Sequence, residues 1–249
     1  MDLMSKEWLD AFWSISELRA NLVIFCNIFG ALLLGLLVGY ERSYHGRAAG
    51  MRTYGMVCMA SAALTVFVGY PEYWFAGHGQ HAASIDPTRV VQGIVTGIGF
   101  LGAGVIMKEG LNISGLTTAA SIWASSAIGV LVGIGFYGAA ISLTLLSSSL
   151  MLWGATLEAR LPSRHAIGVN LHFAAGRQAS QAQVAQLLLQ SGYELAEKSI
   201  AIGVRDQQFE WNFVAVAINR DAGASLPTLA NALQAHADIE RFQLSHARN

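Results

Sequence analysis

The chain has 249 residues, of which 53% are hydrophobic and only 12% are charged, and its formal net charge is −1. Soluble domains carry about 25% charged residues on average, so this composition excludes a chain that is soluble along its whole length. No basic patch is available for nucleic acid, which we therefore do not expect as a partner.

The few charged residues are unevenly distributed along the chain. Between Ala20 and Leu157 there are only five Lys or Arg and four Asp or Glu residues, whereas the sequence from Pro162 onward has the composition of a soluble domain. We therefore predict a transmembrane domain over residues 1–160 and a cytoplasmic domain over residues 161–249.

The first domain is predicted to be a membrane α-helical bundle. Trp8, Phe12 and Ile15 recur at helical spacing, which predicts a short helix at the membrane interface. About five transmembrane helices follow, because five apolar segments approach the roughly 20 residues that cross a bilayer. The tight Gly133–Gly135 turn predicts that the last two form an antiparallel hairpin. The five segments cover residues 21–40, 52–68, 90–107, 117–134 and 136–157.

The third segment is unusually rich in glycine. Small residues let helices approach closely in lipid, and Gly93 and Gly97 have the spacing for it, so we predict that this is the central packing helix. Its glycines also match the dinucleotide-binding pattern G-x-G-x-x-G, but that motif must lie between a strand and a helix, so we reject a nucleotide site. The predicted packing residues are Gly93, Gly97, Gly99, Gly102 and Gly104.

Lysine and arginine residues predict the orientation of the bundle. Arg42, Arg47, Arg52 and Lys108 would share one side with the C-terminal domain, whereas Arg89 would lie on the other side. Because cytoplasmic loops carry an excess of Lys and Arg, we expect the N-terminus outside and the C-terminal domain inside the cell.

Charged residues that border the predicted helices have two interpretations. Ionisable groups at membrane depth often mark a functional site, here a cation or proton site with Glu41 or Asp86 as weak metal candidates. Alternatively, the charges lie at the interfaces and fix helix ends, which is the interpretation we favour. The predicted topology separates Asp86 from Glu41 and Glu109, which could share a pocket on the cytoplasmic side.

The segment Lys108–Thr118 is predicted to be a loop between two helices. Gly115 permits a sharp turn, Thr117 and Thr118 can cap the following helix, and Asn112 offers both a donor and an acceptor. This pattern is as typical of a well-capped turn as of a small polar site or a contact with a regulator.

The C-terminal domain reads as alternating strands and helices. Strands are predicted at residues 167–173, 199–205, 210–219 and 239–244, with helices at 178–190 and 226–237. The order βαββαβ is that of the α+β ferredoxin-like arrangement. No Ser-His-Asp set or nucleophile elbow occurs, so we expect no enzymatic activity.

Separated motifs of the membrane domain together resemble the MgtC/SapB family of bacterial inner-membrane proteins, and the C-terminal domain looks like the ACT-like domain of its longer members. These motifs are Gly39–Arg42, Ala49–Thr53, Asp86–Arg89, Gly97–Gly104 and Gly115–Trp123. With the charged residues and the loop, they define a candidate polar membrane site of Glu41, Arg42, Arg52, Thr53, Asp86, Arg89, Glu109, Asn112, Thr117 and Thr118.

The resemblance implies a role in growth at low magnesium, in the virulence of intracellular pathogens and in the control of membrane energetics. We accordingly expect a non-enzymatic inner-membrane regulator that lies in membrane lipid, forms a homodimer and contacts a membrane protein such as the ATP synthase. No cofactor is expected apart from Mg²⁺. The alternative is a transporter or channel for Mg²⁺ or another cation.

Overall fold

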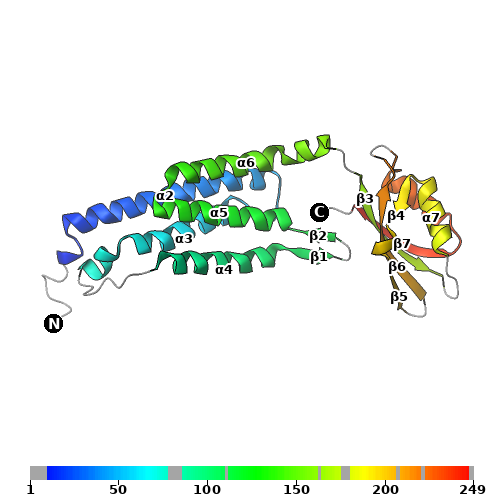
Figure 1. Ribbon diagram of the computed structural model, residues 1–249, viewed down its shortest axis with the longest axis horizontal. Coiled ribbons are helices and arrows are strands. Elements are labelled where there is room, and N and C mark those ends of the chain that lie inside the picture. The colour runs from blue at the N-terminus through cyan, green and yellow to red at the C-terminus, as the bar shows by residue number, and fades with distance from the viewer. Residues whose placement is uncertain are drawn as a thin grey trace. The chain divides into compact units, whose positions relative to one another are not determined.

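The computed structural model describes residues 10–77, 86–109, 112–161, 164–174, 180–205, 208–219 and 222–246. The chain forms two compact units (Figure 1). One comprises the residues up to Ile106 together with Gly115–Ala155, and the other comprises Met107–Ser114 and Thr156–Asn249.

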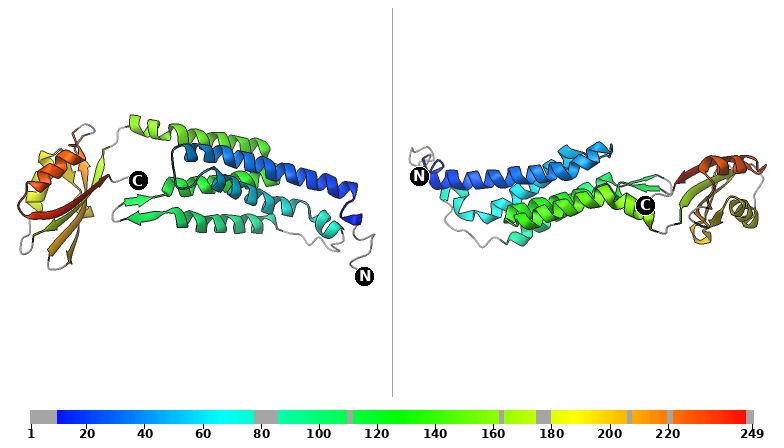
Figure 2. Two further views of the ribbon diagram at one scale, coloured as in Figure 1. Left: turned by 180° about the vertical axis from the view of Figure 1, so that it is seen from behind. Right: turned by 90° about the horizontal axis from the view of Figure 1, so that it is seen from above.

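Five helices in the described part of the chain are long and apolar enough to cross a membrane, which confirms the predicted number (Figure 2). Gly135 ends the fourth of them with a left-handed φ of 92°, so the predicted tight turn before the fifth is also confirmed. The helices are α2 (Ile15–Tyr44), α3 (Met51–Gly69), α4 (Pro87–Val105), α5 (Leu116–Ile134) and α6 (Tyr137–Arg160), and a short 3-10 helix, η1 (Pro71–Gly77), follows α3.

Helix α2 begins earlier than the first predicted segment. Ser14 caps it by accepting a hydrogen bond from the Glu17 N–H at 3.3 Å, so Ile15 starts a continuous helix of 30 residues. Ile15 therefore does not belong to a separate interfacial helix as predicted, and Trp8 lies outside the described residues. At 1.5 Å per residue α2 is about 45 Å long, which exceeds the roughly 30 Å hydrocarbon core.

Helices α3 and α5 are the most buried of the five, and α3 packs against both α2 and α5. The apolar windows of these helices are 44% and 50% buried, whereas that of α4 is 11% buried. A Cβ atom added to Gly129 would lie 2.1 Å from the Cys58 carbonyl oxygen, and one added to Gly133 would lie 2.6 Å from the Thr65 Cβ. The prediction that the third segment is the central packing helix is therefore wrong within this chain.

The glycines of α4 that were predicted to pack against other helices mostly have empty space beside them. Apart from the backbone of α4 itself, no atom of the described residues lies within 4 Å of a Cβ added to Gly93, Gly97, Gly99 or Gly104, and a Cβ at Gly102 meets only the Ala119 Cβ at 3.7 Å. Regular spacing shows which residues share a helix face, but it does not show which neighbour that face meets. These positions thus do not pack helices together inside the chain as predicted.

A short hairpin stands where the sequence predicted a loop. Strands β1 (Met107–Glu109) and β2 (Asn112–Ser114) pair antiparallel. Gly115 follows with φ 86°, and a Cβ there would lie 1.9 Å from the Val105 carbonyl oxygen, so the predicted sharp turn is confirmed.

Gly115 also changes how α5 begins. It is the N-cap residue of this helix, and no side chain makes a cap hydrogen bond there. Thr117 and Thr118 consequently lie inside the first turn, two and three positions after the N-cap residue, and the prediction that they cap the helix is wrong.

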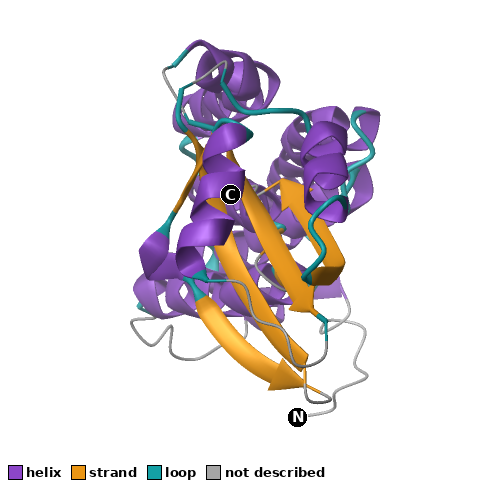
Figure 3. Ribbon diagram, turned by 90° about the vertical axis from the view of Figure 1, so that its right-hand side faces the viewer, coloured by secondary structure: helices purple, strands orange, loops and turns teal. Residues whose placement is uncertain are grey.

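The C-terminal unit contains a five-stranded antiparallel sheet (Figure 3). Its strand order is β4-β6-β3-β7, and β5 also pairs with β6, so β4 and β5 form one edge interrupted by a short 3-10 helix, η2 (Glu197–Ser199). This is the predicted βαββαβ arrangement. The elements are β3 (Ala166–Phe173), α7 (Gln181–Gln190), β4 (Tyr193–Leu195), β5 (Ala201–Arg205), β6 (Gln208–Ala217), α8 (Leu226–Gln234) and β7 (Ile239–His246).

Alternating apolar residues build the core of this unit. In β3 and β6 every second side chain is buried, which places one face of the sheet under α7 and α8. The core includes Val169, Leu171 and Phe173 from β3, Trp211 and Phe213 from β6, and Leu188, Leu229 and Leu233 from the helices.

Candidate functional site

A buried ion pair lies near the C-terminal end of α2. Glu41 and Arg42 are only 8% and 6% exposed, and the Arg42 Nε donates to the Glu41 Oε2 at 2.6 Å. The second carboxylate oxygen of Glu41 lies 3.0 Å from the Nδ1 of His45, one helical turn further on. The Arg42 Nη2 also reaches the Met151 Sδ of α6 at 2.7 Å. The two charges thus neutralise each other, and the contact of Arg42 with Met151 connects α2 to α6.

A row of hydroxyl groups continues into the bundle between α3 and α5. The Tyr54 hydroxyl and the Ser121 Oγ are 2.5 Å apart, and the Ser61 and Ser126 hydroxyls are 2.8 Å apart. The Ser125 Oγ donates to the Tyr54 carbonyl oxygen at 3.0 Å. We call Tyr54, Ser61, Ser121, Ser125 and Ser126 the hydroxyl seam. Because each of these groups is hydrogen-bonded, the seam joins the two helices in an apolar environment.

The predicted polar site is only partly assembled. Glu41 and Arg42 are buried together, and Thr118 is buried at the start of α5, with its carbonyl oxygen accepting from Ser121. Arg52, Thr53 and Thr117 are exposed at the same end of the bundle. Glu109 and Asn112 are paired residues of the hairpin, but their side chains lie outside the described part of the structure.

Asp86 and Arg89 lie at the opposite end of the bundle, at the start of α4. The other end of α4, at Val105, lies against Gly115 at the start of α5. Asp86 caps α4 by accepting hydrogen bonds from the Thr88 N–H at 2.9 Å and from the Thr88 hydroxyl at 2.6 Å. These bonds lower the pKa of the Asp86 carboxyl and keep it charged. Asp86 and Arg89 are both exposed. Their surroundings suit charges that fix a helix end at an interface.

The two weak metal candidates, Glu41 and Asp86, are therefore far apart. In the parts of the chain that the structure describes, no three His, Cys, Asp or Glu residues come together as metal ligands would.

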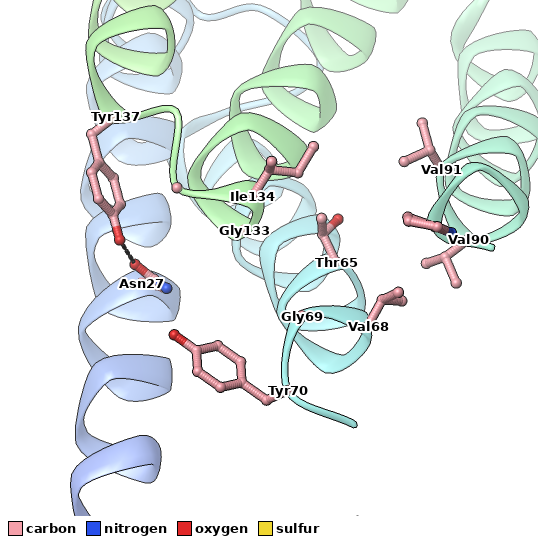
Figure 4. Close-up of a pocket in the computed structure, with 12 residues that line it drawn as sticks. Asn27, Thr65, Val68, Gly69, Tyr70, Val90, Val91, Gly133, Ile134 and Tyr137 are labelled. Atoms are coloured by element: carbon pink, nitrogen blue, oxygen red, sulfur yellow. Dashed lines mark hydrogen bonds between the residues drawn. The ribbon is translucent and has the colours of Figure 1, made fainter. Parts of the chain in front are cut away.

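A cavity of about 370 Å³ opens at the same end as Asp86 (Figure 4). Asn27 of α2 lines it and is only 6% exposed, and its Oδ1 accepts a hydrogen bond from the Tyr137 hydroxyl at 2.6 Å. Tyr70 enters from the end of α3 with its hydroxyl directed towards Asn27, while Thr65 lies on the α3 wall. Asn27 is not among the residues predicted for a functional site, although an asparagine within an apolar helix is a signal for one.

Comparisons with known proteins give relatives for the membrane unit. The sequence model of the MgtC family matches residues 28–160. Protein MgtC of Brucella abortus (strain 2308) is 47% identical over 106 residues, which are 43% of this chain and 40% of that protein. Protein MgtC of Salmonella typhimurium (strain LT2) is 42% identical over 120 residues, which are 48% of this chain and 47% of that protein. The matched region thus spans less than half of each relative, and no solved structure matches the chain.

Proposed function

Because this chain belongs to the MgtC family, we propose that it is a non-enzymatic regulatory protein of the bacterial inner membrane that takes part in magnesium homeostasis. In this proposal its helices bind another membrane protein, the proton-driven ATP synthase, and so adjust membrane energetics when magnesium is scarce. Its N-terminus faces outward and its C-terminal domain faces the cytoplasm, since Arg42, Arg47, Arg52 and Lys108 follow the positive-inside rule on that side.

The observation that carries the proposal is the unpacked apolar surface of α4 and α6. Each buries only 11% of its membrane window against the rest of the chain. Along α6, Leu146, Leu150 and Trp153 are 69%, 67% and 67% exposed. Exposed apolar faces of this kind suit contacts with the helices of another membrane protein, which associate by close van der Waals packing.

A cation transporter is the second candidate, and the buried Glu41 and the hydroxyl seam favour it. Together they place a carboxylate and several oxygen atoms in the interior of the bundle. However, the Glu41 carboxylate is already paired with Arg42, and the seam hydroxyls bond to one another or to carbonyl groups. Mg²⁺ usually keeps several waters and binds one or two carboxylates, so this interior would have to open before it could conduct.

One reconstitution separates the two candidates. The purified chain is placed in liposomes with the ATP synthase, and both ATP-driven proton pumping and entry of external Mg²⁺ are followed with dyes. The proposal predicts slower pumping and no Mg²⁺ entry above that of liposomes with the synthase alone. The double variant Leu146→Ala, Leu150→Ala should restore pumping if α6 forms the contact. Saturable Mg²⁺ entry that Glu41→Gln or Asp86→Asn abolishes, with unchanged pumping, would overturn the regulator and support the transporter.

We also propose that the C-terminal domain forms a homodimer in the manner of an ACT-like domain. Edge strand β5 pairs only with β6 among the described strands, and its Ile202 and Val204 are 55% and 65% exposed. An edge with apolar side chains is a template for pairing with a second chain. The mass of the detergent-solubilised chain, measured by light scattering, should fall from dimer to monomer in Val204→Lys. An unchanged dimer would move the interface elsewhere.

A further inference from the structure

Two hollows of the membrane unit meet at Val90. One is the cavity beside Asn27, of about 370 Å³, and the other is a groove of about 470 Å³ between α3 and α4. Val90 lines both of them. The cavity has polar groups on its walls, whereas the groove is almost wholly apolar and includes Ala60, Leu64, Gly93, Gly97 and Leu101. The two hollows are thus adjacent, and we call the cavity the polar end and the groove the apolar arm.

The polar end contains an amide group that lacks a partner. Asn27 is 6% exposed, and its Oδ1 is engaged by Tyr137, but its Nδ2 has no hydrogen-bond partner among the described residues. Figure 4 shows this nitrogen on the side of Asn27 that faces the Tyr70 hydroxyl. This nitrogen opens onto the cavity and can donate two hydrogen bonds, so a ligand with acceptor oxygens would be favoured at this position.

The apolar arm has room for a chain because α4 carries glycine there. Apart from the backbone of α4 itself, no atom of the described residues lies within 4 Å of a Cβ added to Gly93 or Gly97, so each glycine leaves space above the helix surface. Ser61 also lines the groove, but its hydroxyl is already hydrogen-bonded to Ser126 and needs no partner from a ligand. Combined with the cavity, the arm falls within the volume range of small-molecule sites, roughly 300–1,000 Å³.

We propose that this site binds one glycerophospholipid, with its ester and phosphate oxygens at Asn27 and Tyr70 and one acyl chain in the groove between α3 and α4. A helix from a second copy could fill the groove, but its apolar face would leave the Asn27 amide unpaired. A phospholipid offers acceptor oxygens to the polar end and an acyl chain to the apolar arm.

Native mass spectrometry tests this proposal. The full chain is mixed in mild detergent with a defined mixture of phosphatidylglycerol and phosphatidylethanolamine, and the detergent is removed in the spectrometer. The wild type should retain one phospholipid per chain. Gly97→Leu fills the arm and should lower the retained fraction about tenfold. Asn27→Leu keeps the side-chain volume, removes the amide and should lower it similarly. Gly99→Leu is the matched control, because Gly99 also has open space but does not line the groove, and it should retain the lipid.

The same spectra give the outcomes that would overturn the proposal. Equal lipid retention in all four proteins would show lipid that merely surrounds the helices. A lipid-free dimer that dissociates in Gly97→Leu but not in Gly99→Leu would assign the groove to a second copy of the chain. Helix content is checked by circular dichroism, and Ala60→Leu, which fills the arm from α3, replaces Gly97→Leu if that variant does not fold. The inference does not depend on the proposed regulatory role.

Discussion

Helices α5 and α4 contain the same kinds of residue in opposite surroundings. In α5, Gly129 and Gly133 lie against the backbone and side chains of α3, and Ser121 and Ser126 bond to hydroxyls across the interface. In α4, Gly93 and Gly97 face open space, and the Thr96 hydroxyl bonds only within its own helix. Small and hydroxyl-bearing residues therefore close an interface in one helix and leave a lipid-facing groove in the other.

The largest difference is expected for arginine. Arg42→Ala would leave the Glu41 carboxylate buried without its partner, which should lower the free energy of unfolding by about 3–5 kcal/mol. Arg89→Ala removes an exposed arginine at the start of α4 and should change it by less than about 0.5 kcal/mol. Unfolding in mixed detergent micelles with increasing SDS measures both. Equal losses would mean that the buried pair contributes no more than a surface charge.

Glycine provides the next comparison. Gly129→Ala places a Cβ against the Cys58 backbone and should cost about 1–3 kcal/mol. Gly97→Ala should be neutral or slightly stabilising, because alanine favours a helix and the space is open. The same SDS titration measures the free energy of unfolding of both variants. A greater loss for Gly97→Ala than for Gly129→Ala would restore α4 to the centre of the bundle.

Hydroxyl groups should show a smaller effect. Tyr54→Phe removes one bond of the hydroxyl seam and should cost roughly 0.6 kcal/mol, the average for hydrogen bonds between membrane helices. Thr96→Val removes a hydroxyl that bonds to the Gln92 carbonyl oxygen of its own helix and faces outward, so it should leave stability nearly unchanged. If the two variants unfold alike, the seam does not bind α3 to α5.

The smallest effect concerns acidification at the start of α4. The Thr88 bonds lower the pKa of Asp86 in the folded chain, so their stabilising effect is complete above the ordinary pKa of about 3.9 and is lost as the pH falls further. The melting temperature of the wild type should therefore drop more between pH 5 and pH 3 than that of Asp86→Asn, by circular dichroism. Parallel curves for the two proteins would show that the cap does not titrate in this range.

Much of the fold could be predicted because it depends on local sequence. Runs of apolar residues gave the five helices, the Gly133–Gly135 pair gave the last turn, and alternation in β3 and β6 gave the sheet. The centre of the bundle could not be found in this way. Spacing places Gly93 and Gly97 on one face of α4, but whether that face meets a helix or lipid depends on the rest of the chain.

The candidate site shows the same division. Glu41 and Arg42 are neighbours in sequence, and their importance could be inferred from charge beside an apolar segment. Asn27 and Tyr137 are 110 residues apart, so their hydrogen bond and the cavity beside it follow only from the fold. The N-cap of α5 was mistaken because the threonines suggested side-chain capping, whereas the backbone turn at Gly115 sets the start of the helix.

The arrangement with α5 inside and α4 outside can be tested most directly by labelling the wild-type chain in membranes with a lipid-soluble diazirine. After photolysis, mass spectrometry of the peptides locates the inserted carbene. Phe100 of α4, which is 82% exposed, should be labelled about as strongly as Leu146 of α6, while Ile122 and Ile128 of α5 should be almost unlabelled. Labelling of Ile122 and Ile128 that equals or exceeds that of Phe100 would contradict this arrangement.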